Sequence, residues 1–347
     1  MMNLHLDKDA FRVLIENIHE KTGYRSDVLE KDYYVVLVLE ELAALQKQGL
    51  PVYFKGGTAL YKALKTTNRF SEDIDLSVDT RNCSRTQSDK RLDSATKRYA
   101  SLSRDPLQGK TNRSEVTSVY TYPPIVDYDR QDLLQRFGKL KVEATSFTIS
   151  EPYTDMEVSA MIYDFAEKEQ KDILKEQYDV KPFSVKTMTI ERIFIDKLFA
   201  AEAYVRAVRS APFVTERIEH RAFEAAKHIY DLSVMRNHPK IVLFLHDEEQ
   251  MKKLLDIRTK EELERLDGVP NVSPCDFIFF SQVSNLNLVR KAYETMQNQY
   301  VLLEKDRIDF ADAVKSLEEI HNELVQNLSW KLYQVPIRSR ERNDDAR

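Results

Sequence analysis

The sequence is short of cysteine, of long apolar runs and of excess basic charge, and each shortage excludes a class of protein. Cys83 and Cys275 are the only cysteines in 347 residues, too few and too far apart for a disulfide framework or a multi-cysteine zinc site. A reducing cytoplasm fits this usage best. The longest apolar stretch, residues 33–39, is far shorter than the roughly 20 residues of a membrane-spanning helix. The N-terminus breaks its apolar residues with charges, unlike a signal peptide. We therefore expect a cytoplasmic protein with no membrane partner.

The overall charge gives no argument for a polyanionic partner, because 52 lysines and arginines stand against 57 acidic residues, a formal net charge of -5. One segment departs from this balance. Between residues 81 and 113 there are three acidic residues against nine basic ones: Arg81, Arg85, Lys90, Arg91, Lys97, Arg98, Arg104, Lys110 and Arg113. Such a stretch is able to contact phosphates. It is equally compatible with a solvated loop, and the sequence leaves both interpretations open.

The periodicity of apolar residues changes near residue 155, and a chain of this length has room for two domains. Before that point we expect helices over 8–20, 27–47 and about 88–100, a long loop after the third, and strands over 52–54, 74–78 and 140–149. After it we expect helices over 157–176, 190–208, 215–235, 247–265, 287–304 and 310–329, with a β-like break at 184–188. The polar tail after Pro336 should be frayed. The prediction is an α+β domain over 1–155, with a mixed sheet and flanking helices, followed by an α-helical domain over 156–347.

Two aspartates stand two residues apart at the start of the expected strand over 74–78, with Asp73 just before it and Asp75 inside it. Asp73 and Asp75 should point to one face of the sheet while Ile74 and Leu76 face the core. Two carboxylates this close repel each other unless a cation lies between them. Phosphoryl-group chemistry on a nucleoside triphosphate uses such carboxylates to hold a divalent metal ion. An isolated Asp-x-Asp pair also occurs by chance, so this pair alone does not establish a metal site.

The expected strand at 52–54 runs into Gly56, Gly57 and Thr58. Thr58 would cap a short helix over 59–65, and the glycines would allow close approach of a phosphate to backbone N–H groups. Alone, this string is also compatible with a simple turn. A strand, Gly-Gly-Thr, a helix and then a strand with Asp-x-Asp together match the nucleotidyltransferase fold of the polymerase-beta superfamily.

The strings KGGTAL at 55–60 and RFSEDIDL at 69–76 resemble the hallmark of AbiEii/AbiGii-type nucleotidyltransferase toxins, the toxin half of AbiE-type toxin–antitoxin systems. The string EKDY at 30–33 resembles an upstream element of that family, and Lys197 and Asp231 lie in strings that resemble its two C-terminal motifs. The resemblance spans roughly residues 25–235. It implies transfer of a nucleoside monophosphate from a nucleoside triphosphate (NTP) to an acceptor hydroxyl with release of pyrophosphate. It also suggests an RNA acceptor, with tRNA as the candidate, and a separately encoded antitoxin.

A third carboxylate is needed to complete the metal site and to help deprotonate the attacking hydroxyl. Glu143 is the candidate, because strand alternation points it away from Leu140 and Val142; an exposed strand glutamate is the alternative. Lys197 is a charged residue within an otherwise strongly apolar expected helix. It is either a cation that neutralises the triphosphate or an ordinary surface lysine. The predicted site comprises Asp73, Asp75 and Glu143 for Mg²⁺ or Mn²⁺, and Gly56, Gly57, Thr58, Lys197 and Asp231 for the nucleotide.

Two functions of other classes remain open from the residues alone. One is a nucleotidyltransferase of the same fold that modifies a small molecule or a protein side chain. The other is a catalytically silent nucleotide-binding protein that acts by interaction. No residue in the sequence indicates which base is selected or how many copies of the chain assemble.

Overall fold

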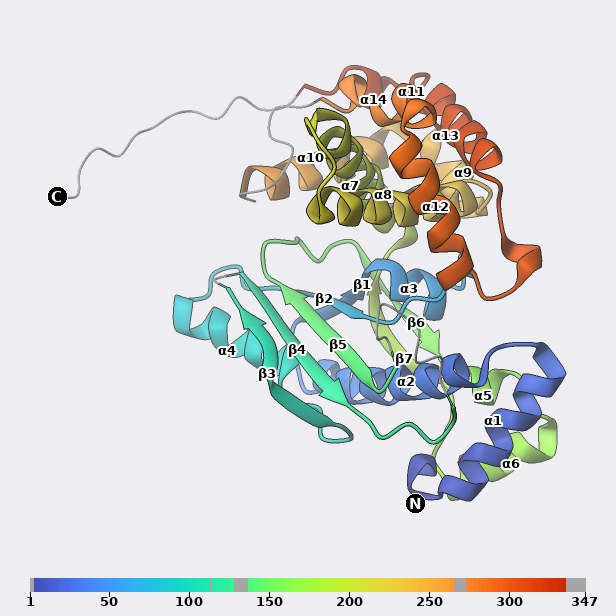
Figure 1. Cartoon of the computed structure of the whole chain (residues 1–347). Helices are drawn as coiled ribbons and strands as arrows, with labels where there is room; N and C mark the ends of the chain where they lie inside the picture. Colours follow the sequence, from blue (N-terminus) through green and yellow to red (C-terminus); the bar gives the residue numbers. More distant parts are fainter. Residues whose placement is uncertain (1–2, 113, 128–136, 265–272, 335–347) are drawn as a thin grey trace. The chain divides into compact units, whose positions relative to one another are not determined.

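The computed structural model describes residues 3–112, 114–127, 137–264 and 273–334 (Figure 1). The chain divides into two compact units. Unit 1 comprises Met1–Ile193 and Gln297–Arg307, and unit 2 comprises Phe194–Met296 and Ile308–Arg347. The tail that we expect to be frayed, after Pro336, lies outside the described residues.

Unit 1 is built on a seven-stranded mixed sheet with the strand order β3-β4-β5-β2-β1-β7-β6. β1 pairs in parallel with β7, and β2 pairs in parallel with β5, while the other neighbours are antiparallel. The strands are β1 (Val52–Lys55), β2 (Ile74–Val78), β3 (Ser103–Thr111), β4 (Glu115–Thr121), β5 (Lys139–Thr145), β6 (Tyr153–Val158) and β7 (Phe183–Met188). This sheet and its helices confirm the predicted α+β fold class.

The helices of unit 1 form where apolar residues recur at helical spacing and local signals end the pattern. In α1, for example, Phe11, Leu14 and Ile18 are buried on one face, Asp7 accepts from Ala10 N at the start, and Gly23 ends the helix at φ +76°. The elements are η1 (Leu4–Leu6), α1 (Lys8–Thr22), α2 (Ser26–Lys47), α3 (Gly56–Lys62), α4 (Arg85–Thr96), α5 (Met161–Asp164), α6 (Lys168–Gln177), the end of α12 (Asn287–Tyr300) and η4 (Glu304–Asp306).

Helix α4 covers one face of the sheet and leaves the other to the polar residues of β2. The Tyr120 hydroxyl of β4 donates to the Thr96 carbonyl of α4, so this face of β4 lies against the helix. The register puts Ile74 on the same face, because residues 118, 142 and 74 are aligned across β4, β5 and β2. Asp75 therefore points to the opposite face.

Unit 2 is helical. Its elements are α7 (Ile190–Ser210), α8 (Glu216–Met235), α9 (Pro239–Leu245), α10 (Glu248–Glu264), η2 (Pro274–Asp276), α11 (Phe279–Gln282), η3 (Val283–Asn285), α12, α13 (Phe310–Leu324) and α14 (Leu328–Lys331), with α7 beginning and α12 ending in unit 1. Residues at helical spacing in α7 and α8, including Phe194, Leu198, Ala225 and Ile229, are fully buried. In the part of the chain that the structure describes, no helix has both the length and the apolar character to cross a membrane.

The structure differs from the sequence predictions around the basic segment and after residue 155. The predicted long loop is a β-hairpin, because β3 and β4 pair across residues 103–121 although β3 is exposed and lacks apolar alternation. The predicted helix over 157–176 is instead the end of β6 followed by α5 and α6. Because β7 pairs with β1 and β6, residues up to 193 group with unit 1.

Candidate active site

The strand register brings one predicted acid directly beside another. Asp75 of β2 is paired with Glu143 of β5 on one side and with Lys55 of β1 on the other. Directly paired residues share a face of a sheet and have Cβ atoms about 5 Å apart. Asp73 lies just before β2, and its carboxylate contacts Lys141 of β5, which shares the face of Glu143. All three predicted carboxylates thus come from adjacent chain segments on the face opposite α4.

The two glycines after β1 make room for the carboxylate segment. Gly56 has φ +78°, and a Cβ there would lie 2.9 Å from Asp75 Cγ and closer still to Asp75 Oδ2. A Cβ on Gly57 would lie 2.9 Å from both Arg69 Nη2 and Ser71 Oγ. Only glycine allows the start of α3 to approach the β2 segment this closely. The Gly-Gly pair therefore has a structural role in seating the acids.

Thr58 lies inside α3 and does not cap it, which corrects the prediction that it would be the N-cap. The helix begins two residues earlier, at Gly56, and Lys55 is the N-cap. The Thr58 side chain is fully buried; its hydroxyl donates to the Asp73 carbonyl, and its oxygen lies 2.9 Å from Ser71 Oγ, whose hydroxyl is able to donate to it. Thr58 thus fastens α3 to the segment that carries Asp73.

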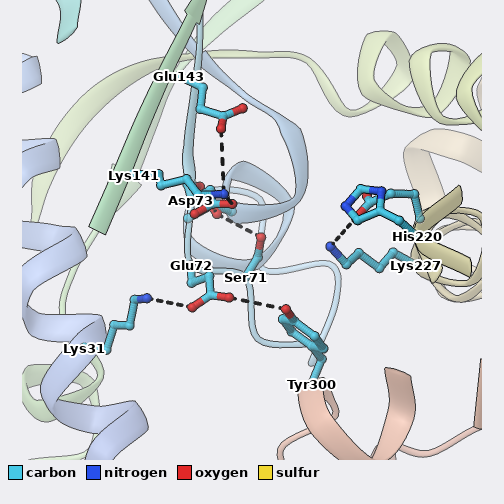
Figure 2. A network of polar contacts seen from close by, with 11 residues as sticks. Lys31, Ser71, Glu72, Asp73, Lys141, Glu143, His220, Lys227 and Tyr300 are labelled. Atoms are coloured by element: carbon cyan, nitrogen blue, oxygen red, sulfur yellow. Dashed lines mark hydrogen bonds and ion pairs between the residues drawn. The ribbon is translucent and has the colours of Figure 1, made fainter. Parts of the chain in front are cut away.

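A lysine that the sequence analysis did not single out stands between two of the acids (Figure 2). Lys141 Nζ lies 3.6 Å from Asp73 Oδ2 and 3.9 Å from Glu143 Oε1. The charge of Asp73 raises the pKa of Lys141. Burial, and then the nearby negative charge of Asp73, raise the pKa of Glu143. Lys141 could have been found from the alternation of β5, which puts it on the same face as Glu143.

The donor set suits a hard divalent cation, since carboxylate oxygens are the ligands that Mg²⁺ and Mn²⁺ prefer. Burial and, after it, repulsion from Asp73 raise the pKa of Glu143, and a bound cation would relieve that repulsion. Within the described ranges, no three acidic, histidine or cysteine side chains lie close enough together to hold a metal ion as they stand. An ammonium group lies instead between Asp73 and Glu143. The convergence of the three carboxylates on one ion stays a prediction.

Lys55 is a second lysine that the sequence analysis did not assign. Its side chain shares the face of Asp75 through the register, and Lys55 Nζ donates to Thr145 Oγ1 at 3.0 Å and to Thr148 Oγ1 at 3.1 Å. The Lys55 backbone pairs with Asp75, and its ammonium group reaches Thr145 of β5, two residues after Glu143. The string KGGT was a usable signal for Lys55, because it places this lysine at the end of β1, immediately before Gly56.

Lys197 and Asp231, predicted to bind nucleotide, contact each other within unit 2. Lys197 Nζ donates to Asp231 Oδ2 at 2.6 Å, and the two side chains are 6% and 0% exposed. Lys197 is therefore not an ordinary surface lysine. The Asp231 carboxylate is fully buried and accepts from Lys197, so it holds the Lys197 ammonium group in one orientation.

The basic segment divides into paired and exposed cations. Arg81 is paired with Asp79 and Glu151, Arg91 donates to the Asp79 carbonyl, and Lys97 is paired with Asp93. Five others are exposed and, within the described residues, in no ion pair: Arg85, Lys90, Arg98, Arg104 and Lys110. Arg113 lies outside the described residues. Only part of this segment is therefore available for a polyanion.

Comparison with known proteins adds one match. A family model described as "Nucleotidyl transferase AbiEii toxin, Type IV TA system" matches residues 37–319, which is most of the chain. The matched range contains β1, α3, β2 and β5, and in unit 2 the Lys197–Asp231 pair. No curated protein matches the chain.

Proposed function

The chain belongs to the AbiEii family of nucleotidyltransferase toxins of type IV toxin–antitoxin systems, and we propose that it transfers a nucleoside monophosphate from an NTP to a hydroxyl of RNA. The family match confirms the family that the motifs at 55–60 and 69–76 resemble. The acceptor we favour is tRNA, and pyrophosphate is released. The observation that carries the proposal is the alignment of Asp75 with Glu143 on one sheet face, beside Asp73 and the close turn at Gly56.

Asp73, Asp75 and Glu143 would hold Mg²⁺ or Mn²⁺ at this face. When bound, the ion would offset the negative charge of the triphosphate and of the three carboxylates. Glu143 is the group of this set that we assign to the proton of the attacking hydroxyl, because its own ionisation is already disfavoured by burial and by Asp73. Lys55, whose ammonium group contacts Thr145 of β5, keeps the negative charge of Asp75 and Glu143 partly compensated.

The nucleotide-binding roles follow from the same assignment. The backbone at Gly56 and Gly57 would receive the phosphates, and Lys197 would neutralise the triphosphate. Asp231 would orient Lys197 through the buried ion pair. Thr58 would act through Asp73, since its hydroxyl already donates to the Asp73 carbonyl.

We propose two partners beyond the nucleotide, of which membership in a toxin–antitoxin family supports the first. One is a separately encoded antitoxin protein that restrains the activity. The other is the RNA acceptor, and we place the reaction in the cytoplasm, where both NTPs and tRNA occur. The exposed cations of α4 and β3 are the described groups of the basic segment that would contact its phosphates.

The test uses the purified chain with each NTP labelled at the α-phosphate, Mg²⁺ and total RNA. We expect label to move to RNA with one or a few of the NTPs. Asp73→Ala and Asp75→Ala should each abolish the transfer while the protein stays folded, because removing one carboxylate also relieves repulsion in the metal-free protein. Full activity in either variant would remove these residues from the site. Label on a protein or small molecule would replace the acceptor, and nucleotide binding without transfer would favour a silent binder.

A further inference from the structure

A buried ion pair joins α2 to the residue immediately before Asp73. Lys31 Nζ donates to Glu72 Oε2 at 2.6 Å, and the two side chains are 3% and 12% exposed (Figure 2). Glu72 itself lies outside the sheet, because β2 begins at Ile74. The ion pair therefore fixes a residue that lies before the start of β2.

Glu72 has a second partner from a distant part of the sequence. The hydroxyl of Tyr300, the last residue of α12, donates to Glu72 Oε1 at 3.3 Å (Figure 2). The Tyr300 carbonyl also accepts from Phe70 N at 2.7 Å, and Arg69 forms a β-bridge with Val301. The chain before Asp73 thus lies between α2 and residues 300–301, and each oxygen of the Glu72 carboxylate has its own donor.

Stability alone is a poor explanation for such a contact. Desolvating a buried lysine and glutamate offsets most of the attraction between them, and apolar side chains of similar volume often stabilise a protein as well or better. A carboxylate that accepts directional hydrogen bonds through both oxygens has a more restricted position than an apolar side chain would. What the contact supplies is a defined position for residue 72 and, through the next peptide, for Asp73.

We propose that Lys31, Glu72 and Tyr300 are positioning residues, which set where the Asp73 carboxylate lies relative to Asp75 and Glu143. This inference rests on the proposed function, and it requires none of the three side chains to touch the substrate. Thr58 holds the same segment through a separate contact, because its buried hydroxyl donates to the Asp73 carbonyl. Position matters here because Mg²⁺ demands near-ideal octahedral geometry from its ligands.

The test compares variants of this network in the full-length protein. Glu72→Gln and Lys31→Met each break the ion pair, and the double variant removes both charges. Tyr300→Phe deletes a single hydroxyl and is the variant expected to keep the fold if the others do not. Glu202→Gln is the matched control, since the buried Glu202 carboxylate accepts from Arg206 and from Phe279 N within unit 2. Each protein is measured for Mn²⁺ affinity without nucleotide, for KM and kcat, and for its thermal unfolding midpoint.

We expect Glu72→Gln and Lys31→Met to lower kcat and Mn²⁺ affinity by on the order of 10- to 100-fold, the size typical of residues that orient metal ligands. KM for the NTP should change far less. The double variant should lose no more kcat and Mn²⁺ affinity than the single variant that loses more, because both substitutions act through one contact. Tyr300→Phe should lower Mn²⁺ affinity several-fold at an unchanged unfolding midpoint. Glu202→Gln should shift the midpoint and leave Mn²⁺ affinity and kcat as in wild type.

Three outcomes would overturn the inference. The first is wild-type Mn²⁺ affinity in the folded network variants. The second is losses of Mn²⁺ affinity and kcat that scale with the fall in unfolding midpoint, in the network variants and in Glu202→Gln alike. The third is losses that add in the double variant. If the wild-type protein transfers no nucleotide at all, the proposed function fails by itself. The Mn²⁺ affinities then decide the positioning role without reference to turnover.

Discussion

Gly56 occupies a backbone position that two separate constraints reserve for glycine. Its φ of +78° is unfavourable for other residues, and a Cβ would overlap the Asp75 carboxylate. We predict that Gly56→Ala abolishes transfer, because the new methyl group must push Asp75 away from Glu143. The loss should exceed about 100-fold in kcat, the scale of a displacement of about 1 Å at a catalytic group. Steady-state kinetics on the folded variant measures this.

Gly49 offers the matched control, since it also has a positive φ, of +90°, but a Cβ there would meet nothing within 4 Å. Gly49→Ala should cost about 1–2 kcal/mol in unfolding free energy from backbone strain alone and leave kcat unchanged. If both variants lose stability equally and both keep their activity, the contact between Gly56 and Asp75 has no catalytic importance.

Lys141 is a resident cation between Asp73 and Glu143, so it competes with any divalent ion for the same charge. We predict that Lys141→Met binds Mn²⁺ more tightly than wild type in the absence of nucleotide. The gain should be on the order of 10-fold, equivalent to about 1.4 kcal/mol. Electron paramagnetic resonance of free Mn²⁺ measures the affinity directly.

Lys139→Met is the control for this substitution, because Lys139 lies on the same face of β5 but its Nζ donates to Gln108 and contacts neither acid. It should leave Mn²⁺ affinity at the wild-type value. Unchanged or weaker Mn²⁺ binding in Lys141→Met would mean that the lysine helps to hold the carboxylates in place.

At the scale of elements, the sequence predicted what depends on local pattern and missed what depends on distant partners. β1, β2 and the close turn at Gly56 follow from alternation and from glycine, and all were predicted. β3 was not, because its pairing with β4 compensates for a sequence that has no buried face. The contact between Glu72 and Tyr300 joins residues 228 positions apart and leaves no local signal.

Helix α2 also holds the chain after β4 through a carboxylate with an unusual ionisation. Glu30 accepts from Ile125 N at 2.8 Å and from Val126 N at 3.4 Å. Burial raises the pKa of Glu30 from 4.5 to about 7, although both hydrogen bonds act in the opposite direction. The folded protein therefore binds a proton here over a pH range in which the unfolded chain has released it.

The sign of the pH dependence follows from this difference. Between pH 4.5 and about 7 the folded state binds more protons at Glu30 than the unfolded state does, so the free energy of unfolding falls as the pH rises. The contribution of Glu30 to the free energy of unfolding is fully present below pH 4.5 and is lost as the pH rises through about 7. We predict that Glu30→Gln removes this dependence, which amounts to up to about 3 kcal/mol. Urea unfolding of both proteins at pH 5, 6, 7 and 8 measures the change.

Glu41 provides the comparison on the same helix, since it also accepts from two backbone N–H groups, those of Ala100 and Ser101. Glu41→Gln tests whether losing any such carboxylate alters the pH profile. If Glu30→Gln and wild type keep a constant difference in unfolding free energy from pH 5 to 8, the ionisation of Glu30 is not linked to folding.

For the molecule as a whole, a net charge of -5 opposes binding to a polyanion, so binding must come from local groups. The structure shows which cations of the basic segment are available for such binding. Arg91 and Lys97 serve the fold through Asp79 and Asp93, and replacing them would confuse binding with stability. Arg98, Arg104 and Lys110 are exposed and in no ion pair with described residues, so they are the better positions to test.

We predict that replacing these three cations with glutamine weakens RNA binding and makes it less sensitive to salt, while affinity for the NTP stays the same. Each phosphate contact releases counterions, so losing three should reduce the slope of log affinity against log salt by about 2 to 3. The control replaces Lys252, Lys253 and Lys260, which are equally exposed on α10 and change the net charge by the same amount. RNA binding across a salt series measures all three proteins. A general charge effect would lower the RNA affinity of both variants alike. A salt slope equal to that of wild type would mean that this segment is a solvated surface, and would favour an acceptor other than RNA.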